Sequence, residues 1–221
     1  NIIDYYKLNL NYDMAYLILV RHGESQWNAK GIWTGLTDIP LSEKGRQEAK
    51  NVASLLRNIK LDIAYTSVLT RAKQTLSVIK NVLGLKSLPT FENKALNERD
   101  YGVFTGKNKW EIEKEYGEKT FLNIRRAWNY PIPQGEMLKD VYTRVIPYYK
   151  HEILPKLKEN KNILIVAHGN SLRALVKYLE NISDENISRV ELSTGEIYVY
   201  NIDRNGNIAS KETRMSNSVT S

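Results

Sequence analysis

The sequence predicts an α/β fold, a single domain of three layers, α/β/α, built around a mostly parallel sheet. Short apolar runs typical of strands alternate with longer runs of helical periodicity, which is the rhythm of such a fold. No linker or change in composition divides the chain, and its 221 residues suit one large domain. Hydrophobic residues make up 42% of the chain, enough to form a sizeable core.

The individual elements follow in order along the chain. Strand-like runs at 16–20, 63–66 and 163–167 are each followed by a helix-like run, at 42–56, 71–83 and 171–179. Near the end, runs at 197–202 and 208–213 flank a turn formed by Asp203-Arg204-Asn205-Gly206. Asn-Gly in such a connection favours a hairpin. Three strand–helix pairs and one hairpin are therefore expected.

The predicted helices have a regular apolar stripe. In the first, Ala49, Val52, Ala53 and Leu56 fall at i, i+3, i+4 and i+7, so they share one face. The last helix repeats this spacing from Leu172 to Leu179, and Asn170 or Ser171 is available as its N-cap. These stripes are interpreted as core.

The ends of the chain are expected to lie outside the domain. Residues 1–13 are interpreted as an N-terminal extension, 14–215 as the domain and 216–221 as a flexible tail. The first residues have neither the basic start nor the apolar core of a secretory signal. The longest apolar run, 15–20, is far shorter than the ~20 residues that a membrane helix needs. We therefore expect a cytoplasmic protein that does not span a membrane.

Charge and cysteine content narrow the possible functions. The chain has no cysteine, which excludes disulfides, a thiolate nucleophile and zinc-ribbon spacing. Its net charge of +7 could serve nucleic acid, anionic lipid or a small anionic substrate. No recognised nucleic-acid-binding motif accompanies that charge, so a nucleic-acid partner is not expected.

Two distant segments share one pattern, an apolar strand followed by one residue and then His-Gly-x-Ser. They contain His22 and His168, respectively. Open α/β sheets place ligands at the carboxyl ends of their strands, so the two imidazoles are expected to meet there. A glycine after each histidine allows a sharp turn and a close approach to an oxyanion. The third histidine, His151, lies in a charged helical stretch and is interpreted as structural.

Metal binding and phosphate chemistry are the two interpretations of this pair. Two histidines are too few for a zinc site, and Glu24 is placed on a loop without a further histidine nearby, so no metal is expected. Arg21 precedes the first histidine, and Arg71 opens a predicted helix. Guanidinium binds phosphate bidentately and stays charged, which favours phosphate chemistry.

The residues around these histidines also carry a family resemblance. Leu19-Val20-Arg21-His22-Gly23-Glu24-Ser25 resembles the phosphohistidine motif of the histidine phosphatase superfamily. The segments at 27–28, 33–35, 66–72, 96–102 and 167–179 are similar to the cofactor-dependent phosphoglycerate mutases. The resemblance extends from about Met14 to Ile202 and implies a phosphoglycerate-mutase-like fold. It also implies an isomerase that transfers a phosphoryl group through a phosphohistidine.

The resemblance implies five catalytic residues. These are His22 as the nucleophile, Arg21 and Arg71 as a cationic cradle, His168 as a hydrogen-bond donor to the transferring oxygens, and Glu98 as proton donor and acceptor. Neighbouring guanidiniums are expected to lower the pKa of His22. The last helix is expected to direct free amides at the same anion. The alternative for Glu98 is an ordinary ion pair with Arg99.

The substrate-binding residues implied by the same resemblance are Ser25, Asn28, Thr34, Gly35, Arg99, Tyr101, Lys109, Arg125, Arg126, Gly169 and Asn170. Cations around a second anionic end are what a mutase needs to hold a bisphosphorylated intermediate. The implied reaction interconverts 3- and 2-phosphoglycerate. It is primed by 2,3-bisphosphoglycerate, which phosphorylates His22, and requires no metal. The expected partner is a small anionic phosphate ester, and a homo-oligomer is possible, with monomer and dimer both open.

One departure from the family pattern concerns the lid. Only eight residues separate Arg126 from Gly135, whereas longer family members carry an insertion there. A looser lid admits water, so some hydrolysis is expected as a side reaction. The alternative function is therefore a small-molecule phosphomonoesterase of the same superfamily, acting through the same residues.

Overall fold

The computed structural model describes residues 14–216, so the expectations for residues 1–13 and 217–221 lie outside the described residues. Six strands form one sheet in the order β3-β2-β4-β1-β5-β6. They are β1 (Met14–Arg21), β2 (Ile63–Thr66), β3 (Thr90–Glu92), β4 (Ile163–Ala167), β5 (Glu196–Asp203) and β6 (Ile208–Met215). The first four are parallel to one another, and the β5–β6 hairpin is antiparallel. The predicted mostly parallel sheet is confirmed.

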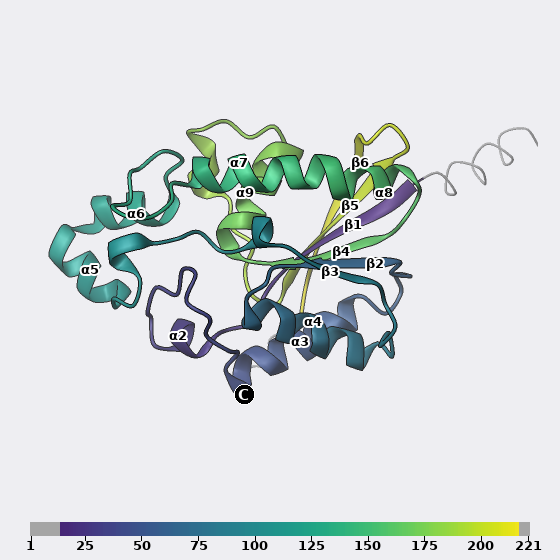
Figure 1. The fold of residues 1–221 in the computed structure, drawn as a ribbon, viewed down its shortest axis with the longest axis horizontal. Helices are drawn as coiled ribbons and strands as arrows, with labels where there is room; N and C mark the ends of the chain where they lie inside the picture. Colours follow the sequence, from purple (N-terminus) through teal and green to yellow (C-terminus); the bar gives the residue numbers. More distant parts are fainter. Residues whose placement is uncertain (1–13, 217–221) are drawn as a thin grey trace, which may run out of the picture.

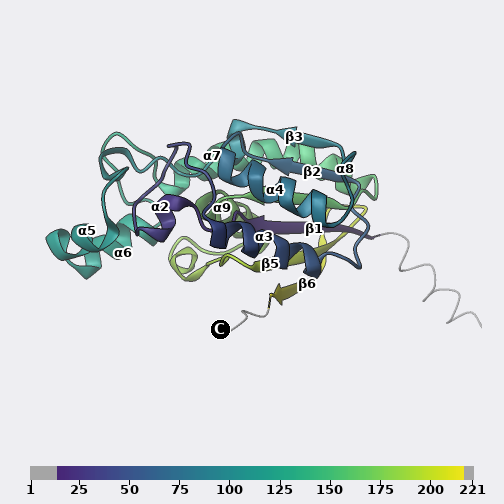
Figure 2. The ribbon, with the colours of Figure 1, turned by 90° about the horizontal axis from the view of Figure 1, so that it is seen from below.

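Helices cover both faces of the sheet (Figure 1). One layer contains α3 (Glu43–Leu55) and α4 (Thr70–Val82), seen in front of the strands in Figure 2. The other contains α7 (Leu138–Tyr148), α8 (Leu154–Lys158) and α9 (Gly169–Leu179); a π-helical turn, Tyr149–Ile153, joins α7 to α8. The predicted three-layer architecture is therefore confirmed.

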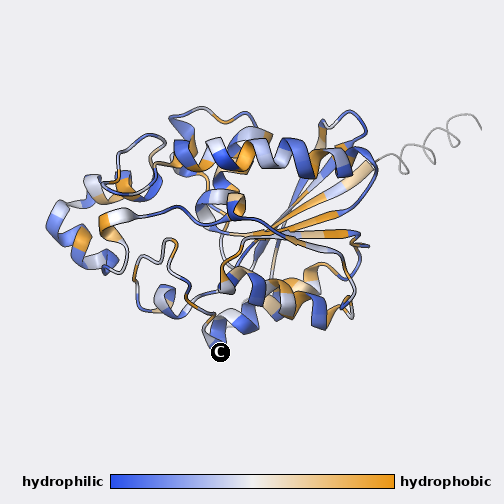
Figure 3. Ribbon diagram, viewed as in Figure 1, coloured by the Kyte–Doolittle hydropathy of each residue, from blue (hydrophilic) through white to orange (hydrophobic). Residues whose placement is uncertain are grey.

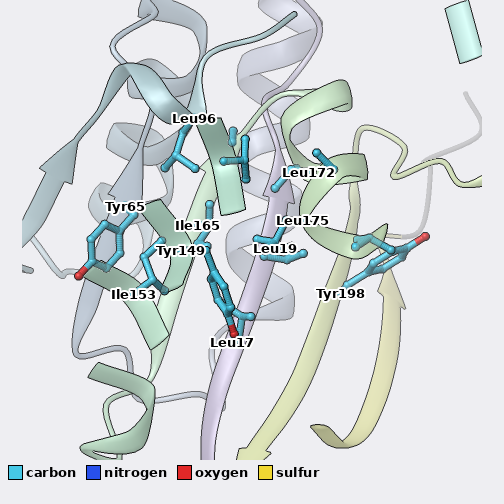
Figure 4. Packing of buried hydrophobic residues seen from close by; sticks show 14 of the residues in the cluster. Leu17, Leu19, Tyr65, Leu96, Tyr149, Ile153, Ile165, Leu172, Leu175 and Tyr198 are labelled. Atoms are coloured by element: carbon cyan, nitrogen blue, oxygen red, sulfur yellow. The ribbon is translucent and has the colours of Figure 1, made fainter. Parts of the chain in front are cut away.

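The side chains of β1 alternate between two apolar clusters, one on each face of the sheet. Leu17 and Leu19 belong to the cluster under α7 and α9, and Ile18 and Val20 to the cluster over α3 and α4. Successive strand side chains point to opposite faces, which explains this division. The first cluster is shown in Figure 4, and Figure 3 shows apolar residues concentrated on the strands between the helix layers. All five residues of β4 are buried, as expected for a central parallel strand.

A smaller unit lies beyond the carboxyl ends of the parallel strands (Figure 1). It comprises α2 (Gln26–Ala29), α5 (Lys109–Tyr116) and α6 (Glu118–Arg126), with a short 3₁₀ turn at Gly102–Phe104; the 3₁₀ turns at Lys94–Leu96 and Asn186–Arg189 pack instead against the core under α7 and α9. Its own apolar cluster is formed by Trp33, Phe104, Ile112, Phe121, Ile124 and Ile132. We call these elements the cap.

The short segment between Arg126 and Gly135 is tied to the body of the protein. Val103 donates its amide to Pro133 O at 3.1 Å, and Glu136 donates to Asp100 O at 2.9 Å. At Gly102, where φ is +48°, a Cβ would lie 2.1 Å from Pro133 O, so only glycine fits this close approach. Looseness of the lid stays a prediction, and this backbone pairing works against it.

The predicted elements begin close to where the sequence placed them. Ser42 caps α3 by accepting from Gly45 N at 3.0 Å, and the hairpin forms as predicted. The N-cap of α9 was wrongly predicted. It is His168, because Ser171 lies inside the helix and its Oγ accepts from His168 N at 3.1 Å.

Candidate active site

The two histidines lie side by side at the carboxyl ends of adjacent strands. Arg21 pairs with Ala167 in the β1–β4 register, and His22 N continues the ladder by donating to Ala167 O at 3.0 Å. The ring centroids of His22 and His168 are 4.9 Å apart. Both side chains are buried. The expected convergence of the imidazoles is therefore present.

The tautomer of His22 follows from its neighbour. Its Nδ1 lies 2.7 Å from Gly23 O, and because a carbonyl only accepts, Nδ1 carries the proton. Nε2 is then left with its lone pair. Burial, followed by the charges of Arg71 and Arg21, holds the pKa of His22 well below its ordinary value. The expected direction is correct, but desolvation contributes more than the guanidiniums named from the sequence.

His168 is fixed through the opposite nitrogen. Its Nε2 lies 2.7 Å from Ser67 Oγ, which also accepts from Leu69 N at 3.2 Å. In the tautomer that carries the ring proton on Nδ1, the serine hydroxyl donates to Nε2. Nδ1 is buried and has no hydrogen-bond partner within residues 14–216. Burial, then Arg71 and His22, lowers the pKa of His168, so the ring is neutral.

Two arginines lie beside these rings. Arg71 is buried and donates from Nη1 to Thr37 O at 2.9 Å and from Nη2 to Gly35 O at 2.8 Å. Burial lowers its pKa to about 10, so the guanidinium stays charged at neutral pH. Arg21 donates from Nη1 to Leu192 O at 3.3 Å. The Nε–H groups of both are buried without a partner in the described chain, so each has an unused donor.

Glu98 is held by one of its two oxygens. Oε1 accepts from Arg99 N at 2.8 Å, from Asn170 N at 3.1 Å and from Asn170 Nδ2 at 3.0 Å. Oε2 faces Gly169, 3.7 Å from where a Cβ there would lie. The amide of Asn170 at the start of α9 is therefore committed to Glu98. The sequence had led us to expect that this amide would be free to bind an anion, and that expectation was wrong.

The alternative interpretation of Glu98 as an ion-pair partner of Arg99 does not hold. The Arg99 guanidinium is buried, stacks 4.5 Å above the Tyr101 ring and donates to Ile124 O. Glu98 contacts only the main-chain amide of Arg99. Arg99 therefore does not line the pocket itself, but stacks on Tyr101, which does.

One pocket gathers most of the residues singled out from the sequence. Those that line it are Arg21, His22, Asn28, Thr34, Gly35, Arg71, Glu98, Tyr101, Lys109, Arg125, Arg126, Gly169 and Asn170. Ser25, Arg99 and His168 are not on its lining. Ser25 is buried because it caps α2, accepting from Asn28 N at 3.1 Å.

The pocket also contains residues that were not assigned to the site from the sequence: Trp33, Arg173, Glu191 and Leu192. Arg173 is buried and donates to Asn170 Oδ1 at 3.0 Å, Val190 O at 3.0 Å and Arg126 O at 2.7 Å. An arginine within the apolar stretch of the last helix was the available signal for it. Glu191 and Leu192 come from an irregular loop with no pattern to mark them.

Other kinds of site receive no support from residues 14–216. Among them, no three His, Cys, Asp or Glu residues gather closely enough to hold a metal ion. None of the helices in this range has the length and apolar character needed to cross a bilayer.

Known proteins resemble this chain in both sequence and fold. The profile of the histidine phosphatase superfamily (branch 1) matches residues 17–213. A protein named 2,3-bisphosphoglycerate-dependent phosphoglycerate mutase from Bradyrhizobium diazoefficiens is 48% identical over 197 residues, 88% of this chain and 95% of that protein. A protein of the same name from Cytophaga hutchinsonii is 48% identical over 187 residues, 85% of this chain and 87% of that protein. The crystal structure of the alpha-ribazole phosphatase from Shigella flexneri superimposes with a TM-score of 0.73 at 27% identity, covering 92% and 96% of the two chains.

Proposed function

Because this chain belongs to the histidine phosphatase superfamily, and within it to the family of 2,3-bisphosphoglycerate-dependent phosphoglycerate mutases, we propose that it interconverts 3- and 2-phosphoglycerate through a phosphohistidine. The observation that carries this proposal is the pair of buried imidazoles, 4.9 Å apart, beside Arg21 and Arg71. Phosphoryl transfer passes through a loose transition state with charge spread over the equatorial oxygens, so fixed cations are its main requirement.

His22 is the nucleophile in this mechanism. Its unprotonated Nε2 attacks phosphorus; the Nε2–P bond forms as the bond from phosphorus to the donor oxygen breaks. The proton on Nδ1 remains donated to Gly23 O, which stabilises the positive charge on the phosphorylated ring. The low pKa of His22 keeps Nε2 available at neutral pH.

Arg21, Arg71 and His168 stabilise the charge of the transferring group. The partnerless Nε–H groups of the two arginines and the Nδ1–H of His168 are buried donors that need an acceptor. Three equatorial phosphoryl oxygens are acceptors of that kind. Ser67 keeps the His168 proton on the nitrogen that can donate to them.

Glu98 moves the substrate proton. Three N–H donors occupy Oε1, so Oε2 is the oxygen that gives a proton to the departing substrate oxygen and later removes one from the attacking hydroxyl. Arg144 supports this placement by donating to Glu98 O at 2.9 Å while it pairs with Glu136 at 2.8 Å.

The cations of the pocket suit a ligand with two anionic ends. One end meets Arg21 and Arg71 beside the histidines; the other meets Lys109, Arg125 and Arg126 of the cap. When bound, 2,3-bisphosphoglycerate supplies the phosphoryl group that primes His22. Asn28, Thr34, Gly35, Tyr101 and the main chain at Gly169 line the space between the two ends, with Ser25 and Arg99 supporting the wall.

The reaction belongs to glycolysis and gluconeogenesis, which favours a cytoplasmic location and a small phosphate ester as the partner.

The test is product analysis by ³¹P NMR with 3-phosphoglycerate and a trace of 2,3-bisphosphoglycerate. We expect 2-phosphoglycerate as the main product, with minor release of inorganic phosphate. Inorganic phosphate without isomerisation would establish the phosphomonoesterase, which the structural likeness to a phosphatase favours as second candidate.

A further inference from the structure

An acidic side chain lies among the cations of the pocket. Glu191 Oε2 is 2.6 Å from Arg126 Nη2, and its Oε1 is 3.9 Å from Arg21 Nη1. The mechanism gives this carboxylate no role. Its position is unexpected, since a negative charge beside these arginines opposes the binding of an anionic substrate.

The main chain around Glu191 is anchored on both sides. Val190 O accepts from Arg173 Nε at 3.0 Å, and Glu191 O accepts from Tyr198 OH at 2.8 Å. Leu192 is buried in the core, and its carbonyl accepts from Arg21. The Glu191 side chain, by contrast, is 46% exposed. It can therefore rotate into solvent while the loop stays in place.

The two arginines that Glu191 approaches come from different parts of the fold. Arg21 lies beside the histidines, whereas Arg126 belongs to the cap. The contact with Arg126 is a charged hydrogen bond, and the separation from Arg21 is too long to be one. A ligand that needs Arg126 must replace the carboxylate, whereas a ligand held only beside the histidines leaves it in place.

We infer that Glu191 is an internal counter-ion of the second anionic subsite, which a ligand's second charged group must displace from Arg126. It acts as a specificity-determining residue, because it weakens ligands with two anionic ends and leaves those with one nearly unaffected. This inference rests on the proposed function, in which Arg126 receives the end of the substrate remote from His22.

The test is Glu191→Gln, which preserves size and removes the charge. Isothermal titration calorimetry would measure binding of 3-phosphoglycerate, which has two anionic ends, and of inorganic phosphate, which has one. A half-exposed ion pair contributes at most about 1 kcal/mol, so we expect about three- to fivefold tighter binding of 3-phosphoglycerate. Binding of inorganic phosphate should change by less than about twofold.

Two matched variants complete the design. Glu159→Gln removes a carboxylate of similar exposure, 54% against 46%, that pairs with Lys156 and does not line the pocket, and it controls for net charge. In an Arg126→Met background, Glu191→Gln should produce no further tightening, because its partner is gone. Unchanged or weaker binding of 3-phosphoglycerate, an equal gain for inorganic phosphate, or a gain that persists without Arg126 would each overturn the inference. Since these are binding measurements, a failure of isomerisation would be seen separately.

Discussion

The segments at 22–25 and 168–171 have the same His-Gly-x-Ser pattern at the ends of paired parallel strands, yet each residue does something different. Gly23 approaches the main chain of α3 so closely that a Cβ would lie 2.2 Å from Gly45 O. At Gly169 the nearest atom to such a Cβ is Arg21 Cζ, at 3.6 Å. The first glycine is therefore required by packing, whereas the second lies beside Arg21 and Glu98 with room for a methyl group.

The serines and histidines differ in the same way. Ser25 caps the short helix α2, whereas Ser171 bonds both main-chain groups of His168. His22 is oriented by its neighbour Gly23, and His168 by Ser67, 101 positions away. The short motif therefore specifies the position of an imidazole in the fold, and the residues packed against the ring specify its orientation and hydrogen bonding.

The largest expected difference between the two segments is in the loss of activity when the imidazole of His22 or of His168 is removed. His22→Asn deletes the nucleophile, so kcat for phosphoglycerate isomerisation should fall by about 10⁴-fold or more. His168→Asn deletes one donor to the transferring oxygens and should cost about 10²–10³-fold. Steady-state kinetics with labelled 2,3-bisphosphoglycerate would check both. Equal losses, or label retained on the His22→Asn protein, would contradict the assigned roles.

Substitutions of the two glycines should differ in their effect on the stability of the protein. Gly23→Ala forces a methyl group into the main chain of α3, so the free energy of unfolding should drop by about 3 kcal/mol. Gly169→Ala meets only ordinary contacts and should change it by less than about 1 kcal/mol, while raising KM through the methyl group beside Arg21. Urea denaturation of both variants provides the measurement. Similar destabilisation by the two substitutions would be inconsistent with this difference in packing.

The histidines should make stability dependent on pH. Folding lowers the pKa of both, chiefly by burial, so below their ordinary pKa of about 6.5 the unfolded chain binds more protons than the folded one. The free energy of unfolding is therefore not reduced by these histidines above that pH. It decreases as pH falls below it, by up to about 1.4 kcal/mol per pH unit for each histidine. Either His22→Asn or His168→Asn should reduce this slope in urea titrations.

A slope that is unaffected by both buried-site substitutions would mean that carboxyl groups, and not these imidazoles, dominate the acid response.

The smallest expected difference concerns the serines. Ser25→Ala and Ser171→Ala each remove one local hydrogen-bonding hydroxyl, and each should cost about 1 kcal/mol of stability. Ser171→Ala should in addition lower kcat severalfold, because Ser171 Oγ bonds His168 N and O. Thermal unfolding and kinetics of the pair would check this. A larger loss of kcat for Ser25→Ala than for Ser171→Ala would contradict the assignment of only Ser171 to the positioning of His168.

Much of the fold and the site was predictable from local pattern. The apolar runs and helical stripes placed β1, β2, β4, α3 and α4 within a few residues, and the family resemblance is confirmed by the matches over residues 17–213. The strand β3 was missed because it is three residues long and exposed. The cap helices α5 and α6 were missed because each is short, eight or nine residues, and buries only one or two side chains.

By itself, the sequence determined five of the six strands of the sheet, the two histidines at their ends and most of the cations beside them, because periodicity and motifs are properties of neighbouring residues. Only the tertiary structure decided the contact of His168 with Ser67, the binding of Glu98 by Asn170 and the position of Glu191 against Arg126. Each of these depends on groups at least 65 positions apart in the chain, as the separations of 101, 72 and 65 residues indicate. Contacts of that kind are set by how the layers and the cap pack together, which no local pattern encodes.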